Sequence, residues 1–305
     1  MKIACIVPTY NGLADIRRLL DSLAKQQSIF DLYVVDSTST DGTLDFLKNS
    51  VTNLTVVPSS DFNHGGTRQM MINICSRYDI CIFVTQDVYL FDSKSIAKIV
   101  APFFDEKVGA VCGCQVPHDN ANVFAKHARF FNYSKISSVK TMSDVSEFGI
   151  RTAFMSNSFA AYRIEALQSV AGFPKHVIFA EDMYATALML IKGWKIAYAA
   201  DAVCQHSHNY SAKEEFSRYF DMGVFHSRER WIQKVFGGAG GDGLRYVYSE
   251  LKFLGLLRFY LWPLSLFRNA GKFVGYKLGK LERFLPKFMK RKLGMYKRYW
   301  DSPFA

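Results

Sequence analysis

Short, wholly apolar segments alternate with helix-like segments along the first part of this chain. Runs of this kind, without a polar residue at every second position, are typical of strands buried on both faces of a parallel sheet. They occupy residues 3–7, 32–35, 54–57 and 80–84. Between the first two, apolar residues recur at helical spacing from Leu13 to Leu23. The order β-α-β-α-β predicts a doubly wound, mostly parallel α/β sheet whose ligands lie at the carboxyl ends of the strands.

The second part of the chain predicts fewer regular elements. A helix is expected to begin near Thr67, and the polar stretch 117–146 has no clean period. Further strands are expected at 108–116, 156–162 and 196–200, and further helices at 163–170 and 181–191. We therefore expect a single α/β domain over 1–236, followed by an appendage over 237–305.

The positive charge of the chain lies at its C-terminus. Residues 245–305 carry 14 Lys/Arg and 3 Asp/Glu, whereas the rest carries 24 of each sign, out of a formal net charge of +11. A neutral body argues against a nucleic-acid partner, and a basic tail indicates a tethering device. After a Gly-rich joint at 237–243, the tail combines basic residues with Leu, Phe, Tyr and Trp, which suits the surface of an anionic membrane. The alternative is a helical cap packed on the catalytic domain, or a dimer contact.

The six cysteines fall mostly within apolar runs and form no C-x-x-C pair. This pattern predicts reduced core residues and a cytoplasmic protein. No apolar stretch reaches the length of a membrane span. We therefore expect a peripheral protein on the inner face of the cell membrane.

Polar residues follow several of the predicted strands. Asp36 fits contact with a nucleobase or ribose, or equally an Asx-type cap, a role that Asp41 could take instead. Asp87, in Thr85-Gln86-Asp87, fits a divalent cation beside a diphosphate, or a helix cap. In the segment 63–68 (NHGGTR), paired glycines permit close approach to a ligand and Arg68 suits a base carbonyl or phosphate; a plain strand-to-helix turn is the alternative.

Two further motifs carry acids and histidines. Glu181 and Asp182 open a helix, where they either complement its dipole or supply a general base for an acceptor hydroxyl. His206 and His208 are two residues apart after a strand, so in an extended segment they point the same way. They fit a metal or diphosphate contact, or a surface role.

Taken in order, the motifs PTYNG, VVDSTSTDGT, DFNHGGTR, TQD, AEDM and HSHNYS resemble family 2 glycosyltransferases of the GT-A fold. More narrowly, the chain resembles bacterial rhamnosyltransferases that use dTDP-L-rhamnose, over residues 1 to about 230. The resemblance implies a catalytic base at Asp182 and a metal site for Mg²⁺ or Mn²⁺ at Asp87 and His208. It also implies a nucleotide-sugar pocket, lined by Pro8, Thr9, Tyr10, Asp36, Arg68, Gln86 and Asp87. Candidate contacts to the acceptor or the donor sugar are His64, Asn157 and Glu181.

The implied function is an inverting transfer from a dTDP-sugar to a lipid-linked glycan in surface-polysaccharide biosynthesis. The resemblance also implies that the catalytic domain over 1–236 divides into a nucleotide-sugar half at about 1–116 and an acceptor half at about 117–236. Thr85 stands where the family's D-x-D signature has its first carboxylate, which puts the metal affinity in question. The alternatives are a UDP-hexose donor or a sugar nucleotidyltransferase, although the latter normally has a basic Gly-rich loop where this chain has PTYNG. A non-enzymatic membrane scaffold would not need Asp36, Asp87 and Asp182 together. The sequence specifies no oligomeric state.

Overall fold

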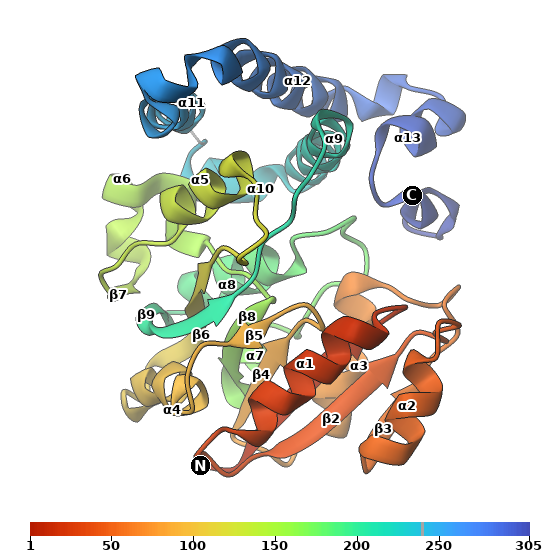
Figure 1. Ribbon diagram of the computed structural model, residues 1–305. Helices are drawn as coiled ribbons and strands as arrows, with labels where there is room; N and C mark the ends of the chain where they lie inside the picture. The colour runs from red at the N-terminus through yellow and green to blue at the C-terminus, as the bar shows by residue number, and fades with distance from the viewer. Residues whose placement is uncertain (239–240) are drawn as a thin grey trace.

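The computed structural model describes residues 1–238 and 241–305. Its centre is a nine-stranded sheet in the order β3-β2-β1-β4-β8-β6-β9-β5, with β7 paired to β9 (Figure 1). The strands are β1 (Ile3–Thr9), β2 (Asp31–Asp36), β3 (Asn53–Val56), β4 (Ile80–Val84), β5 (Tyr89–Leu90), β6 (Val108–Val116), β7 (Ser138–Lys140), β8 (Phe159–Arg163) and β9 (Lys195–Gln205). The helices before the tail are α1 (Leu13–Ala24), α2 (Thr43–Ser50), α3 (His64–Ile74), α4 (Ser95–Val100), α5 (Val123–Asn132), α6 (Val145–Phe148), α7 (Ile164–Ser169), α8 (Glu181–Ile191), α9 (Ala212–Arg228) and α10 (Arg230–Phe236).

The first four strands form the predicted parallel unit. β1 lies between β2 and β4, and β3 pairs with β2, all in parallel. Alternate residues of β1 enter two different cores: Ala4 and Ile6 belong to one, Cys5 and Val7 to the other. Because both faces are covered, every residue of the run is apolar. β1, β2 and β4 therefore deliver their carboxyl ends to one edge of the sheet.

Beyond β4 the sheet is mixed rather than mostly parallel. β8 runs antiparallel to both β4 and β6, and only the β6–β9 pair among the described residues returns to parallel. The chain enters β8 through the long connection 117–158, which contains α5, β7 and α6, instead of a single crossover helix. Such a connection imposes no parallel orientation on the strand that it reaches.

Several sequence-based boundaries differ from the structure; strand β8, for example, begins at Phe159 and not at residue 156. Helix α3 begins at His64, not near Thr67, because the Asn63 side chain caps it by accepting a 2.7 Å hydrogen bond from the Gly66 N–H. The paired glycines thus lie in the first helical turn. Strand β9 extends to Gln205, well past the expected end at Ala200. All six cysteines are buried and free, as predicted.

The tail forms helices α11 (Asp242–Leu254), α12 (Trp262–Lys280) and α13 (Lys287–Leu293), so the predicted helical appendage is present. Figure 1 shows α11 and α12 at the end of the molecule opposite β2 and β3. Helix α12 lies against α9 so closely that Gly275 and Gly279 have no room for a side chain beside the Phe216 and Phe220 carbonyls. Trp300 is buried, with 1% of its surface exposed. The tail is therefore packed on the body; Ala239 and Gly240 of the predicted joint lie outside the described residues.

No helix in 1–238 or 241–305 combines the length and the apolar composition that crossing a bilayer requires.

Candidate active site

The ends of β1 and β4 are joined by the Gln86 side chain. Its Oε1 accepts hydrogen bonds from Thr9 Oγ1 at 2.5 Å and from the Tyr10 N–H at 2.8 Å. Gly12 has no room for a Cβ because the same amide lies against it. Pro8 is in β1, in register with Val35 of β2, and Tyr10 is exposed. The structure thus brings Pro8, Thr9, Tyr10 and Gln86 to one edge of the sheet.

Asp36 ends β2, in register with Thr9. Its side chain is fully buried, and its two oxygens accept from the Ser39 N–H at 2.8 Å and from Ser39 Oγ at 2.5 Å. Asp41 instead serves the start of α2, where it accepts from the N–H and the hydroxyl of Thr43. Asp36 therefore holds its own turn and does not cap the helix.

Asp87 lies against both histidines of the HSHNYS segment. Its Oδ2 is 3.2 Å from His206 Nε2 and 3.8 Å from His208 Nδ1, and Thr85 Oγ1 donates to its Oδ1 at 2.8 Å. One ligand atom from each of Asp87, His206 and His208 lies within 4.8 Å of the others. Burial alone would raise the pKa of Asp87, but the hydrogen bond with His206 and the proximity of both imidazoles hold that pKa well below its usual range.

Gln115 orients the His206 ring. Its Oε1 accepts from Arg129 Nη1 at 2.6 Å and lies 2.8 Å from His206 Nδ1. Since an amide oxygen only accepts, Nδ1 carries a proton, and in the neutral ring the lone pair of Nε2 faces the Asp87 carboxylate. When Nε2 also carries a proton, it donates the hydrogen bond to Asp87 across this 3.2 Å contact; without that proton the two acceptors repel each other, and a cation between them would remove the repulsion. These three side chains therefore fit a divalent cation.

Asp182 lies in the first turn of α8, close behind Ala180, whose φ of +62° is in the left-handed region. Its Oδ2 accepts from the Asn157 N–H at 3.0 Å and its Oδ1 from the Met183 N–H at 2.8 Å. Burial, reinforced by the Glu181 carboxylate, raises the pKa of Asp182 to about 7 against the pull of these two N–H groups. A carboxylate with this pKa is suited to accept a proton near neutral pH.

Glu181 and Arg68 form a buried ion pair instead of facing a ligand freely. Glu181 Oε1 is 3.0 Å from Arg68 Nη1 and accepts from Asn157 Nδ2 at 2.9 Å. Burial would raise the pKa of Glu181, but Arg68, His64 and the Asn157 bond lower it below its usual value. Burial also lowers the pKa of the half-buried His64 to about 4. The structure thus gathers His64, Arg68, Asn157 and Glu181 around Asp182.

Residues 156–158 connect the Asp87 group with the Asp182 group. The Ser158 carbonyl accepts from the Thr85 N–H at 3.1 Å, and Ser156 Oγ accepts from Gln115 Nε2 at 2.9 Å. Asn157, between them, binds both acids of α8. One short segment therefore fixes the metal-type cluster relative to the candidate base.

Besides Gln115, sequence reasoning missed Arg218 of α9 and Tyr296 of the tail. The Arg218 guanidinium lies 5.7 Å from the Phe179 ring centre and 5.9 Å from that of Tyr210. The Tyr296 ring lies 4.5 Å from His64 and stacks on Phe179 at 5.9 Å. No local pattern marks either residue, because each reaches the site through packing between distant segments.

Arg218 acts electrostatically on both the Asp87 group and the Asp182 group. Among residues 1–238 and 241–305 it has no carboxylate within ion-pair distance. Burial alone would lower the pKa of Arg218, but Tyr296, Tyr210 and, more weakly, Asp182 raise that pKa above its usual value. Burial lowers the pKa of His208 to about 4, and the charges of His206 and Arg218 act in the same direction. The charge of Asp87 opposes this shift. Arg218 is thus a cation available to an anionic ligand.

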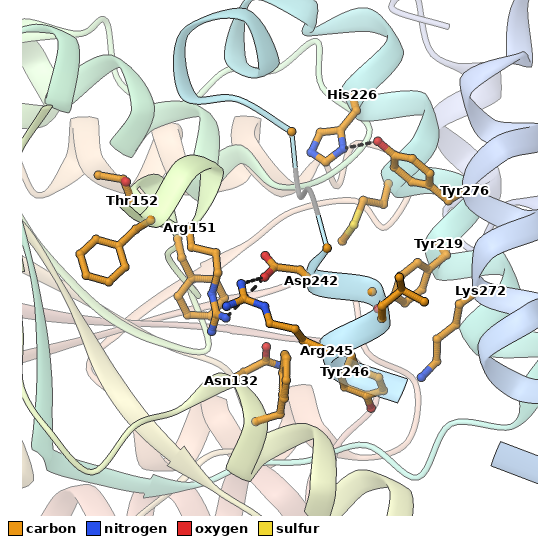
Figure 2. Close-up of a pocket in the computed structure, with 18 of the residues that line it drawn as sticks. Asn132, Arg151, Thr152, Tyr219, His226, Asp242, Arg245, Tyr246, Lys272 and Tyr276 are labelled. Carbon is orange, nitrogen blue, oxygen red and sulfur yellow. Dashed lines mark hydrogen bonds and ion pairs between the residues drawn. The ribbon is translucent and has the colours of Figure 1, made fainter. Parts of the chain in front are cut away.

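A cavity of about 1670 Å³ lies elsewhere, between the body and the tail helices (Figure 2). The side chains of Tyr219, Tyr246, Lys272 and Tyr276 contribute to its wall. Within the part of the chain that the structure describes, none of Asp36, Asp87 and Asp182 lines it. The cavity is therefore separate from the candidate active site.

Comparisons with known proteins show which family the chain belongs to. The model of the family described as "Glycosyltransferase like family 2" matches residues 2–232. The O-antigen chain rhamnosyltransferase RfbN of Salmonella typhimurium is 48% identical, over 99% of this chain and 97% of that protein. WbaN of Salmonella anatum, also an O-antigen chain rhamnosyltransferase, is 45% identical over 97% and 95%.

Solved structures share the fold. A mannosyltransferase of Pyrobaculum calidifontis, PcManGT, in complex with GDP-Man and Mn²⁺, superposes with a TM-score of 0.65 at 18% identity, over 93% of this chain and 87% of that one. At this identity, the likeness shows the architecture alone.

Proposed function

The chain belongs to glycosyltransferase family 2, and from that premise we propose that it transfers L-rhamnose from dTDP-L-rhamnose to a lipid-linked oligosaccharide. That it is a glycosyltransferase of surface-polysaccharide biosynthesis follows from its near full-length relatives. The observation that carries the finer proposal is the 48% identity with an O-antigen chain rhamnosyltransferase across 99% of this chain.

The nucleotide sugar would bind at the edge formed by the ends of β1, β2 and β4. Pro8, Thr9 and Tyr10 would contact the base and ribose there. Gln86 would hold the loop that carries them, and Asp36 would hold the neighbouring turn after β2. The Arg68 guanidinium is already paired with Glu181, so we propose that Arg68 supports this part of the site through that ion pair. We assign this role to residues 1–116 and acceptor selection to residues 117–236.

The proposed cofactor is Mn²⁺, held by Asp87, His206 and His208. Two imidazoles and one carboxylate suit Mn²⁺ better than Mg²⁺, which prefers oxygen ligands. The Pyrobaculum mannosyltransferase is itself in complex with Mn²⁺ and a nucleotide sugar. When bound, such an ion neutralises charge on the diphosphate of the leaving group. Thr85, in place of a carboxylate, would orient Asp87 by its 2.8 Å hydrogen bond.

Asp182 would take the proton of the acceptor hydroxyl. The hydroxyl oxygen forms a bond to the anomeric carbon, the bond from that carbon to the diphosphate oxygen breaks, and the proton moves to an Asp182 oxygen. Attack from the face opposite the leaving group inverts the anomeric configuration in one displacement. Asn157 and the Met183 N–H hold the carboxylate still, which favours reaction over reorientation. Arg218 would add positive charge beside the departing diphosphate.

The acceptor is proposed to be presented at the inner face of the cell membrane. Six free, buried cysteines are consistent with a reducing compartment, and the tail contributes exposed cations and aromatic residues. We therefore propose a peripheral location.

The test is donor turnover with purified enzyme, Mn²⁺ and a short lipid-linked acceptor. We expect transfer from dTDP-L-rhamnose and none above background from UDP-glucose or UDP-N-acetylglucosamine. Preference for a UDP-sugar would assign the same chemistry to the alternative donor. Production of a nucleotide sugar from a sugar phosphate and dTTP would instead reveal a nucleotidyltransferase.

A further inference from the structure

A corner between α11 and α12 carries an unusually exposed set of apolar side chains. This α11–α12 corner comprises residues 255–261. Leu257 is 95% exposed and Leu256 is 80% exposed, and Phe259 and Tyr260 are also exposed. Scattered exposed apolar residues need no explanation, but a contiguous cluster marks an interaction surface.

The apolar surface continues along the outer face of α12. Leu264, Phe267 and Val274 are exposed on this face, whereas Leu266 and Phe273, also exposed, line the cavity between the body and the tail helices. Its opposite face is buried against α9, through Gly275 and Gly279. Helix α12 therefore has one side covered by α9 and an apolar side that nothing covers within the described residues.

The charges around this surface are all positive. Residues 251–281 contain no Asp or Glu. Lys252, Arg258, Lys277 and Lys280 are exposed, whereas Arg268 and Lys272 are buried and paired with Glu215. Lys277 and Lys280 line the cavity, so Lys252 and Arg258 are the cations beside the corner. An apolar surface with exposed cations beside it complements an anionic lipid bilayer, whose interface accepts both.

The basic helix α13 is a poorer candidate for the same contact. Lys287 and Arg291 pair with Asp301, and Lys290 pairs with Glu282. Its charges are therefore partly neutralised inside the molecule. This differs from the expectation that basic residues throughout the tail share one membrane role.

We propose that the α11–α12 corner inserts into the interface of an anionic bilayer and anchors the enzyme there. The inference rests on the proposed membrane-surface location and assigns it to specific side chains. Leu256, Leu257, Phe259 and Tyr260 enter the headgroup–acyl boundary, and Arg258 and Lys252 meet the lipid phosphates. The corner suits insertion because Gly255, at φ +63°, and the non-helical Arg258 break the helix and form a compact turn. It lies at the end of the molecule opposite β2 and β3 (Figure 1).

Vesicle binding tests the proposal without any substrate. The full chain is sedimented with vesicles of phosphatidylglycerol and phosphatidylcholine in equal parts, or of phosphatidylcholine alone. The test variant is the double change L257E/F259E, and the matched control is I29E. Ile29 is 94% exposed but lies before β2, in the sheet-forming half. Since all three side chains are exposed, folding is expected to be unaffected, which circular dichroism verifies.

We expect the double variant to lower the partition coefficient on anionic vesicles by at least about tenfold, because two inserted apolar groups become charged. The control should bind like the wild type. The single change R258Q should cost about fivefold on anionic vesicles and nothing measurable on phosphatidylcholine alone.

Unchanged vesicle binding by the double variant would overturn the insertion, even if the wild type binds membranes by another surface. Absence of binding by the wild type would overturn both the insertion and the membrane location. Neither result touches the glycosyltransferase proposal, which donor turnover decides by itself. Sedimentation velocity addresses a second copy of the chain: a dimer that L257E/F259E dissociates, with vesicle binding intact, would make the corner a subunit interface and overturn the insertion.

Discussion

Replacement of Asp182 by asparagine separates its proposed role as a base from any role in folding. The asparagine amide has nearly the same shape but cannot accept the proton of an acceptor hydroxyl. General-base catalysis contributes about 10²–10⁴-fold, so we expect kcat to fall by that factor, equivalent to about 3–5 kcal/mol. Donor binding should persist, because Asp182 lies on α8 and the proposed nucleotide edge lies on β1, β2 and β4.

The same substitution should not destabilise the protein at alkaline pH. The folded protein raises the pKa of Asp182 from 3.8 to about 7, so it favours the protonated acid. Ionisation therefore lowers the stability of the fold progressively as the pH rises from about 4 to about 7, by at most about 4 kcal/mol. The asparagine side chain does not ionise, so the variant avoids this loss of stability at higher pH. It keeps only one of the two backbone hydrogen bonds, and the loss of the other costs about 1 kcal/mol.

The assay combines release of dTDP with thermal unfolding at pH 5 and pH 8. In the wild type, kcat/KM should rise with pH and level off above the Asp182 pKa of about 7. In the variant, the residual rate should lack this rise, and the Tm relative to the wild type should be higher at pH 8 than at pH 5. Turnover within about threefold of the wild type would remove Asp182 from the role of base. A large fall of Tm at pH 8 would contradict the electrostatic reasoning.

Three further predictions concern the surroundings of the site. Glu181→Gln removes the charge that helps to raise the pKa of Asp182, so the rise of kcat/KM should move to lower pH; it also leaves a buried guanidinium unpaired, and urea unfolding should show a loss of about 3–5 kcal/mol. Gln115→Met should weaken Mn²⁺ binding in calorimetry by about 10–100-fold, because the His206 ring loses the acceptor that fixes it; unchanged affinity would mean that the ion binds elsewhere. Trp300→Ala should cost about 3–5 kcal/mol in urea unfolding, and a cost below about 1 kcal/mol would show a detachable tail.

The strand ends could be predicted from the sequence because their signal is local. A wholly apolar run followed by a polar residue both specifies a buried parallel strand and places that residue at the ligand edge. This placed Asp36, Gln86 and Asp87 correctly along the sheet. The two histidines after β9 followed from the two-residue period of an extended segment, and both reach Asp87.

What the sequence could not supply are contacts between distant segments. The charge of Arg68 suggests a phosphate or base contact, but its carboxylate partner, Glu181, lies more than a hundred residues away. The same holds for Gln115, which no motif includes and which orients His206. The antiparallel course of β8 was also missed, because the apolar pattern of a buried strand does not encode its direction.

The tail shows why composition alone left two interpretations open. A basic, aromatic-rich helix has the same composition whether it faces lipid or packs on protein. The structure divides the tail by contact: Arg268 and Lys272 pair with Glu215 of α9, while Arg258 remains exposed. Packing on the body therefore accounts for one face of α12, and the proposed lipid contact concerns the other.

This division decides how membrane attachment can be tested. Truncation from Lys272 would remove Gly275 and Gly279 from the α9 contact, and with them Tyr296, whose ring lies 4.5 Å from His64. Such a truncated chain would expose apolar surface on α9 and lose one side of the candidate active site. Its loss from a membrane fraction, or its loss of activity, would follow from misfolding alone. Only residues that contact solvent in the folded chain separate the two effects, and Leu257, at 95% exposure, is the side chain whose substitution changes the proposed membrane contact and leaves the packing intact.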